Sequence, residues 1–133
     1  MLNIQKLKYK KIHLKKKIKV GQQRIKKNFG YSAIVVLNYT KITSTNCRDI
    51  YQYAIKTLGK TGKFWFTPPT PIIPATSKKK NERMGKGCGV ISSHFYFINS
   101  GKALIEFESI SKAKLVLILE FCKKKLKSKL KLK

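Results

Sequence analysis

The residues with the clearest capacity for chemistry lie between positions 78 and 89. They combine positive charge with glycine: Lys78, Lys79, Lys80, Arg83, Gly85, Lys86, Gly87 and Gly89. Glycine lets a backbone approach a phosphate or a ribose closely, and lysine and arginine supply the charge that a phosphate binds. A nucleotide-binding phosphate loop requires a preceding hydrophobic strand and a helix that opens at Lys-Ser or Lys-Thr, and neither is expected here. The run therefore favours a contact to phosphate or ribose, with a bare flexible loop as the alternative.

Other groups that could do chemistry are poorly arranged for it. Glu106 and Glu108 stand two apart in an expected strand and so share one face. General acid catalysis would need them in a cleft, and in so basic a chain we expect them to pair with lysines. The cysteines and histidines are scattered, at Cys47, Cys88, Cys122, His13 and His94, without the clustered spacing of a metal site. We expect packing or surface roles for them, and no enzyme activity, metal, cofactor or small-molecule substrate.

Charge is the dominant property of the composition. The chain has 133 residues, 31 Lys and Arg against 5 Asp and Glu, and a net charge of +26, while hydrophobic residues make up 42%. The repulsion between these positive charges opposes folding into a compact state unless a polyanion neutralises them. Nucleic acid is a favourable polyanion, because it releases its bound counterions when lysine and arginine neutralise its phosphates. No apolar run is longer than the five residues of Leu115 to Leu119, far below the roughly 20 residues that span a bilayer. A nucleic-acid partner is therefore favoured over a membrane.

Lysine strongly outnumbers arginine, whose only positions are Arg24, Arg48 and Arg83. RNA binding by itself favours arginine, because its planar fork suits phosphates and stacks on bases. The skew indicates AT-rich coding, typical of an organellar genome or an AT-rich bacterium.

The first half of the chain predicts an arm followed by a strand and a helix. Residues 1–28 are a basic arm, in which Lys8, Lys10 and Lys11 lie. Residues 31–37 are β-branched and apolar and predict a buried strand. Thr43 is a suitable N-cap for a helix. Its apolar face is formed by Cys47, Ile50, Tyr51, Ala54 and Leu58, and Gly59 and Gly62 end it.

The second half predicts strands, a long loop and a second helix. Residues 63–67 are a short aromatic strand. Four prolines then predict an irregular basic loop over 68–89. Residues 90–98 and 102–107 predict two strands joined by a hairpin turn at 99–101, the second with one face in water. A helix follows over 111–126, and its core stripe is Leu115, Ile118, Leu119, Cys122 and Leu126.

These elements predict an α+β fold: a largely antiparallel or mixed sheet with two helices packed on one face. The basic arm 1–28 precedes a single domain over 29–126 that contains the loop at 68–89. A basic tail follows over 127–133.

The motif from Arg83 through Met84 to Gly89 resembles the signature of the L-sixteen family of bacterial-type ribosomal proteins, related to the archaeal and eukaryotic L-ten-e proteins. The likeness extends along nearly the whole chain. Matching positions are Met1-Leu2, Lys8-Tyr9-Lys10-Lys11, His13, Phe29-Gly30, Ile42-Thr43, Gly62 to Phe66, Gly101-Lys102, Glu106 and Lys125-Leu126. Cys88 replaces a lysine that is usual in the family, and Ser111 replaces a helix-starting proline.

The resemblance implies a structural protein of the large ribosomal subunit that lies between rRNA helices near the A site and the peptidyl-transferase region. Its partners would be large-subunit rRNA, A-site tRNA and neighbouring ribosomal proteins. The arm residues Lys8, Lys10, Lys11 and His13 and the loop residues, Met84 among them, would make the RNA contacts. The sequence departures suit an organelle-encoded copy in a mitochondrial ribosome, with a plastid or the cytoplasm of an AT-rich bacterium as alternatives. A free nucleic-acid chaperone or DNA-compacting protein is the other functional class that the charge permits.

Overall fold

The computed structural model describes residues 27–60, 62–67, 72–85 and 87–133, which form two helices and seven strands. The order is β1 (Ser32–Val36), β2 (Thr40–Thr43), α1 (Ser44–Leu58), β3 (Phe64–Phe66), β4 (Ile72–Ser77), β5 (Val90–Ile98), β6 (Ala103–Phe107), α2 (Lys112–Leu126) and β7 (Leu130–Leu132). The predicted α+β class is confirmed, and every strand pairing is antiparallel.

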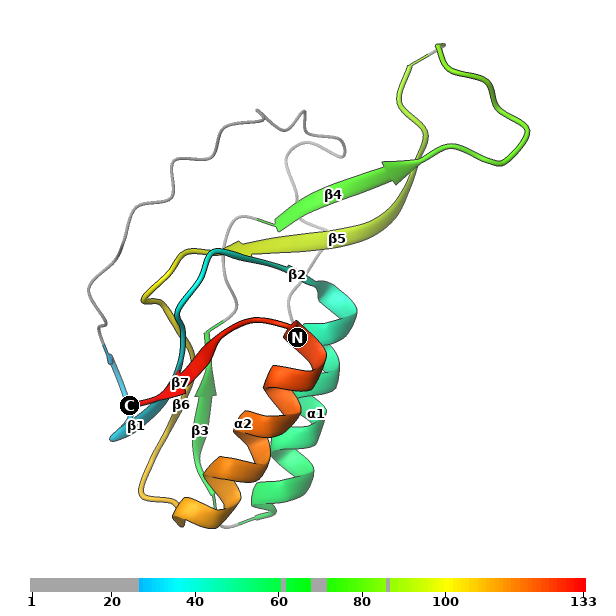
Figure 1. The fold of residues 1–133 in the computed structure, drawn as a ribbon. Coiled ribbons are helices and arrows are strands. Elements are labelled where there is room, and N and C mark those ends of the chain that lie inside the picture. The colour runs from blue at the N-terminus through cyan, green and yellow to red at the C-terminus, as the bar shows by residue number, and fades with distance from the viewer. Residues whose placement is uncertain (1–26, 61, 68–71, 86) are drawn as a thin grey trace.

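The strands divide between two sheets. One has the order β3-β6-β1-β7, and the other has the order β2-β5-β4. The two helices lie side by side against the four-stranded sheet, and the three-stranded sheet extends away from them (Figure 1). The sequence alone did not predict this division.

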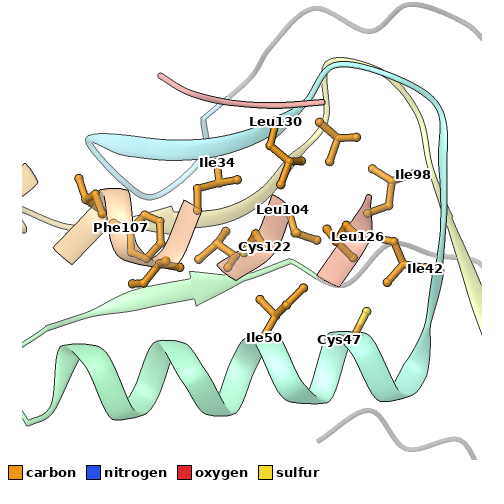
Figure 2. Close-up of a cluster of buried hydrophobic side chains, with 14 of the residues drawn as sticks. Ile34, Ile42, Cys47, Ile50, Ile98, Leu104, Phe107, Cys122, Leu126 and Leu130 are labelled. Atoms are coloured by element: carbon orange, nitrogen blue, oxygen red, sulfur yellow. The ribbon is translucent and has the colours of Figure 1, made fainter. Parts of the chain in front are cut away.

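One large core lies between the helices and the four-stranded sheet, and Ile42 and Ile98 of the three-stranded sheet also belong to it (Figure 2). Ile34 and Phe107 of the sheet, Ile50 of α1 and Ile118 of α2 are each at most 1% exposed. Burial of this kind supplies roughly 1.5–3 kcal/mol for each large apolar side chain. The core therefore fixes how the two helices sit on the sheet.

Helix α1 begins as predicted. The Thr43 hydroxyl accepts a hydrogen bond from the backbone N–H of Asn46 at 3.2 Å, which satisfies one of the unpaired amides of the first turn. Four residues of its predicted face are buried, but Tyr51 is 45% exposed and contacts the rings of Phe64 and Phe66 at its edge. The predicted assignment of Tyr51 to the interior is therefore wrong.

Helix α2 also follows its predicted stripe. Leu115, Ile118, Cys122 and Leu126 are buried, whereas Leu119 is only partly buried and packs at the border of the core. Phe121 stacks on Tyr53 of α1, with ring centroids 3.9 Å apart.

The prediction that residues 68–89 are irregular is wrong for 72–77. These residues form β4, and Pro74 pairs with His94 of β5. Proline removes a ladder donor, but β4 is an edge strand, where one side of the backbone needs no partner.

The predicted hairpin between 90–98 and 102–107 is also wrong. Strands β5 and β6 belong to different sheets, and the Gly101 amide donates instead to the Val36 carbonyl at 2.7 Å. All five residues of β6 are buried, so the predicted wet face does not exist. One face of β6 packs against the core, and on the other face the backbone of residues 28–30 binds Glu106.

The residues expected as a basic tail contribute a strand. Within 127–133, β7 pairs with β1, and Leu130 joins the core. The exposed Lys129, Lys131 and Lys133 alternate with its leucines, as the period of a strand requires.

Candidate nucleic-acid interface

The predicted basic loop lies at the far end of a long hairpin. Strands β4 and β5 pair from Ile72 with Tyr96 to Ser77 with Val90, and residues 78–89 join them. The β4–β5 hairpin extends away from the helices and presents this loop at its tip (Figure 1). The predicted glycines and lysines are thereby carried away from the core.

The glycines have two different tasks. Gly85 and Gly87 have φ values of 105° and 83°, a region that side chains other than glycine rarely adopt, and nothing would touch a Cβ at either position. Gly89 instead lies against β4, where a Cβ would come within 2.5 Å of the Ser77 carbonyl carbon. Two glycines therefore shape the tip, and the third allows the strands to meet beneath it.

The loop is partly closed by its own lysine. The Lys78 ammonium donates to the Arg83 carbonyl at 3.0 Å and also to the Gly85 carbonyl. The Glu82 amide donates to the Lys79 carbonyl at 3.0 Å. Lys78 is also one of the predicted RNA-binding residues, which stays a prediction; in the structure its ammonium bonds to the turn.

Apart from Lys78, the described side chains of the tip that were predicted to bind RNA are exposed. Lys79, Lys80 and Arg83 are exposed, and Met84 is 98% exposed. Glu82 is an exposed acid among them, a feature that the sequence reasoning overlooked. The tip presents exposed glycine backbone beside an arginine side chain, which can donate two parallel hydrogen bonds. This combination is suited to phosphate oxygens.

A second organised region lies where the arm meets the sheet. One carboxylate oxygen of Glu106 accepts hydrogen bonds from the amides of Asn28, Phe29 and Gly30, at 3.0, 2.7 and 3.0 Å. Glu106 is 1% exposed, and charge-assisted bonds of this kind offset the burial of its carboxylate. A Cβ on Gly30 would lie 2.5 Å from the Phe107 carbonyl oxygen, so the chain passes β6 closely.

This arrangement corrects the expectation for the two carboxylates. Glu108 does face Lys63, with the Nζ to Oε2 distance at 3.7 Å. Glu106 instead binds backbone amides 76 to 78 residues away. The signal was present in the sequence, since Phe29-Gly30 and Glu106 both match family positions, but nothing local joined them.

Among the described residues, two of the predicted packing cysteines behave accordingly. Burial raises the pKa of Cys47 and of Cys122 to about 12, so both thiols stay protonated. No group of three or more metal-binding side chains occurs in the described ranges. Within the same ranges, neither helix has the length and apolar character to cross a membrane.

Several predicted site residues lie outside the described residues. They are Lys8, Lys10, Lys11, His13 and Lys86.

Comparison with known proteins identifies a family. The family model described as ribosomal protein L16p/L10e matches residues 4–133. The chain is 32% identical over 103 residues to the large ribosomal subunit protein uL16m of Chondrus crispus, which covers 73% of this chain and 74% of that one. It is 30% identical to the large ribosomal subunit protein uL16 of Orientia tsutsugamushi (strain Boryong), over 95% of this chain and 92% of that one. The corresponding protein of Neorickettsia sennetsu is 26% identical over 90% of this chain and 85% of its own.

Proposed function

This chain belongs to the ribosomal protein L16p/L10e family, and we propose that it is a structural constituent of the large ribosomal subunit that binds large-subunit rRNA. The relatives that it matches are named as proteins of that subunit. The net charge of +26 supports a polyanionic partner, because each neutralised phosphate releases counterions. Within the large subunit, neighbouring ribosomal proteins would be further partners of this chain.

The finer proposal is that the tip of the β4–β5 hairpin helps organise tRNA in the A-site region near the peptidyl-transferase centre. The single observation that carries it is the geometry of the described residues of the loop, 78–85 and 87–89. Arg83 and Met84 are presented outward at the end of a paired hairpin, and the Lys78 ammonium closes the turn behind them. A turn that is already closed loses less conformational entropy when it binds. The loop positions RNA, and the bond-making chemistry belongs to the RNA itself.

The proposed setting is an organellar ribosome, most simply the mitochondrial one. The excess of lysine over arginine is typical of AT-rich coding, and one matched relative carries the name uL16m. Matches of similar strength to bacterial proteins keep a bacterial cytoplasm as the alternative.

The loop proposal is tested with two variants of the tip and a matched control. Arg83→Ala removes the bidentate donor, and Gly87→Val places a β-branched residue at a φ of 83°. We expect both variants to enter large subunits and to bind aminoacyl-tRNA more weakly in the A site, Gly87→Val the more so. The control is Arg48→Ala, which removes an exposed arginine of α1 far from the tip. Unchanged tRNA binding by fully incorporated variants would reduce the loop to an rRNA anchor.

The subunit assignment is tested by sedimentation at high salt. A constituent of the large subunit stays with it, because RNA shape and burial add to charge. A free DNA-compacting protein would stay at the top of the gradient or follow DNA. With an isolated rRNA fragment, affinity should fall by about 10³–10⁵ between 50 and 200 mM salt if some 6–10 phosphates are neutralised.

A further inference from the structure

An exposed aromatic pair lies at the root of the arm, residues 27–31, away from the β4–β5 loop. The rings of Phe29 and Trp65 stack with centroids 6.0 Å apart and planes inclined by 26°. Phe29 is 64% exposed, and Trp65 is partly buried. The outer face of the Phe29 ring is therefore open to another molecule, with a second ring beneath it.

The pair lies on the face of the four-stranded sheet opposite the helices. Phe64 and Phe66 pack against the core on the helix side, and successive side chains of a strand point to opposite faces. Trp65 therefore points the other way, level with Glu106, its partner in the adjacent strand β6. Strand β3 is the edge of the sheet, so this position is open along one side.

The backbone beneath Phe29 is fixed rather than free. Its amide donates to the Glu106 carboxylate at 2.7 Å, and the amides on either side donate to the same oxygen. The close passage of Gly30 along β6 holds the chain against the sheet. The Phe29 ring is thus presented in one place, which lowers the entropic cost of binding to it.

The charges around the pair favour a phosphate-bearing partner. Lys63 shares the Trp65 face, and its side chain is 77% exposed. Lys27 is exposed and donates to the Tyr31 carbonyl at 2.8 Å. Two acidic side chains lie near these lysines. The Glu106 carboxylate already accepts three amide hydrogen bonds, and Glu108 makes an exposed ion pair with Lys63, which contributes little stabilising energy.

We propose that the outer face of Phe29, backed by Trp65, stacks on an unpaired nucleobase of RNA, while Lys27 and Lys63 contact the flanking phosphates. Unpaired bases are the parts of RNA that proteins bind by stacking on aromatic side chains. The stack needs no particular base, since every base has a π-face. The site rests on the proposed role in rRNA binding and adds a contact that depends on bases rather than on charge.

The test compares two strands of equal length and charge: a single-stranded oligoribonucleotide and the same ribose-phosphate strand without bases. Both are titrated into the full chain and into Phe29→Leu, Phe29→Tyr and Tyr51→Leu. The last variant is the matched control, because Tyr51 is also an exposed ring that contacts β3, but from the helix side. Trp65 is the only tryptophan of the chain, so its fluorescence reports the site directly.

We expect the base-bearing strand to quench Trp65 and to bind wild type more tightly than the abasic strand. Phe29→Leu should lower affinity for the base-bearing strand on the order of tenfold, the lower part of the range for one aromatic-base stack. It should leave the abasic strand unaffected. Phe29→Tyr should keep the wild-type preference, and so should Tyr51→Leu.

Three results would overturn the site: equal binding of both strands by wild type, equal losses on both strands in Phe29→Leu, or the same loss in Tyr51→Leu. Each of them leaves the proposed ribosomal role standing if wild type still sediments with large subunits. Failure to sediment with the subunits would count against the ribosomal role itself.

Discussion

The helix-covered sheet and the β4–β5 hairpin are held by different forces. In the first, Ile34, Leu104 and Phe107 are at most 1% exposed, and apolar burial fixes the arrangement (Figure 2). At the tip of the second, Met84 is 98% exposed, and the turn is closed by hydrogen bonds from Lys78 and by glycine backbone geometry.

The difference indicates that burial stabilises the first region within the protein, whereas the second region leaves its polar groups available for binding. The four-stranded sheet and the helices share one buried core, to which β5 also contributes Tyr96 and Ile98 at its end far from the tip. The described residues of the hairpin tip instead expose charge and backbone to solvent. A substitution in the first should therefore be detected as a loss of folding stability, and one in the second as a loss of binding.

The largest effect is expected for Ile118→Ala in α2. Ile118 is 0% exposed in the core, and its truncation should lower the free energy of unfolding by about 2–5 kcal/mol. Val116→Ala, on the exposed side of the same helix, should lower it by less than about 0.5 kcal/mol. Urea denaturation with sulfate present, to offset the charge, measures both. Equal losses would mean that the helix does not bury its predicted stripe.

A matched pair of glycine substitutions tests whether the two regions fail separately. Gly30→Ala and Gly89→Ala both place a Cβ against backbone, at Phe107 and at Ser77 respectively. Each substitution should lower the stability of the region that contains it by about 1–3 kcal/mol, as overpacking usually does. We expect Gly30→Ala to lower the stability of the whole sheet, because Phe107 is buried in its interior.

Gly89→Ala should instead reduce protection only within the hairpin. Hydrogen exchange should show faster exchange of amides in β4 and β5, with β6 amides unchanged. Faster exchange in β6 after Gly89→Ala would contradict the independence of the two regions.

The smallest effect is expected for Met84→Ala at the hairpin tip. The side chain touches almost nothing within the protein, so the free energy of unfolding should change by less than about 0.5 kcal/mol. Thermal unfolding of the variant beside wild type measures this. A larger loss would show that the tip packs on the rest of the chain in solution.

Residue types and short-range spacing predicted an element correctly where the apolar residues of the pattern are also the ones that the fold buries. The N-cap at Thr43 and the stripe of α2 follow from residue type and spacing, and both are present. The strand at 72–77 was not predicted, because proline has no N–H for a central strand to pair. An edge strand tolerates proline, since one side of its backbone needs no partner. For the candidate site, RNA binding by the loop residues stays a prediction, and the hydrogen bonds that Lys78 makes within the turn depend on where its side chain folds.

By itself the sequence determined the charge, the two amphipathic helices, the positions of the glycines and the family. These properties depend on residue type and on spacing over a few positions, where the periods of helix and strand apply. Only the tertiary structure decided that β5 and β6 part into separate sheets, that β7 joins β1, and that Glu106 binds amides 76 to 78 residues away. Such contacts bring together segments far apart in the chain. Their stability comes from burial and hydrogen bonds that exist only after the core has formed.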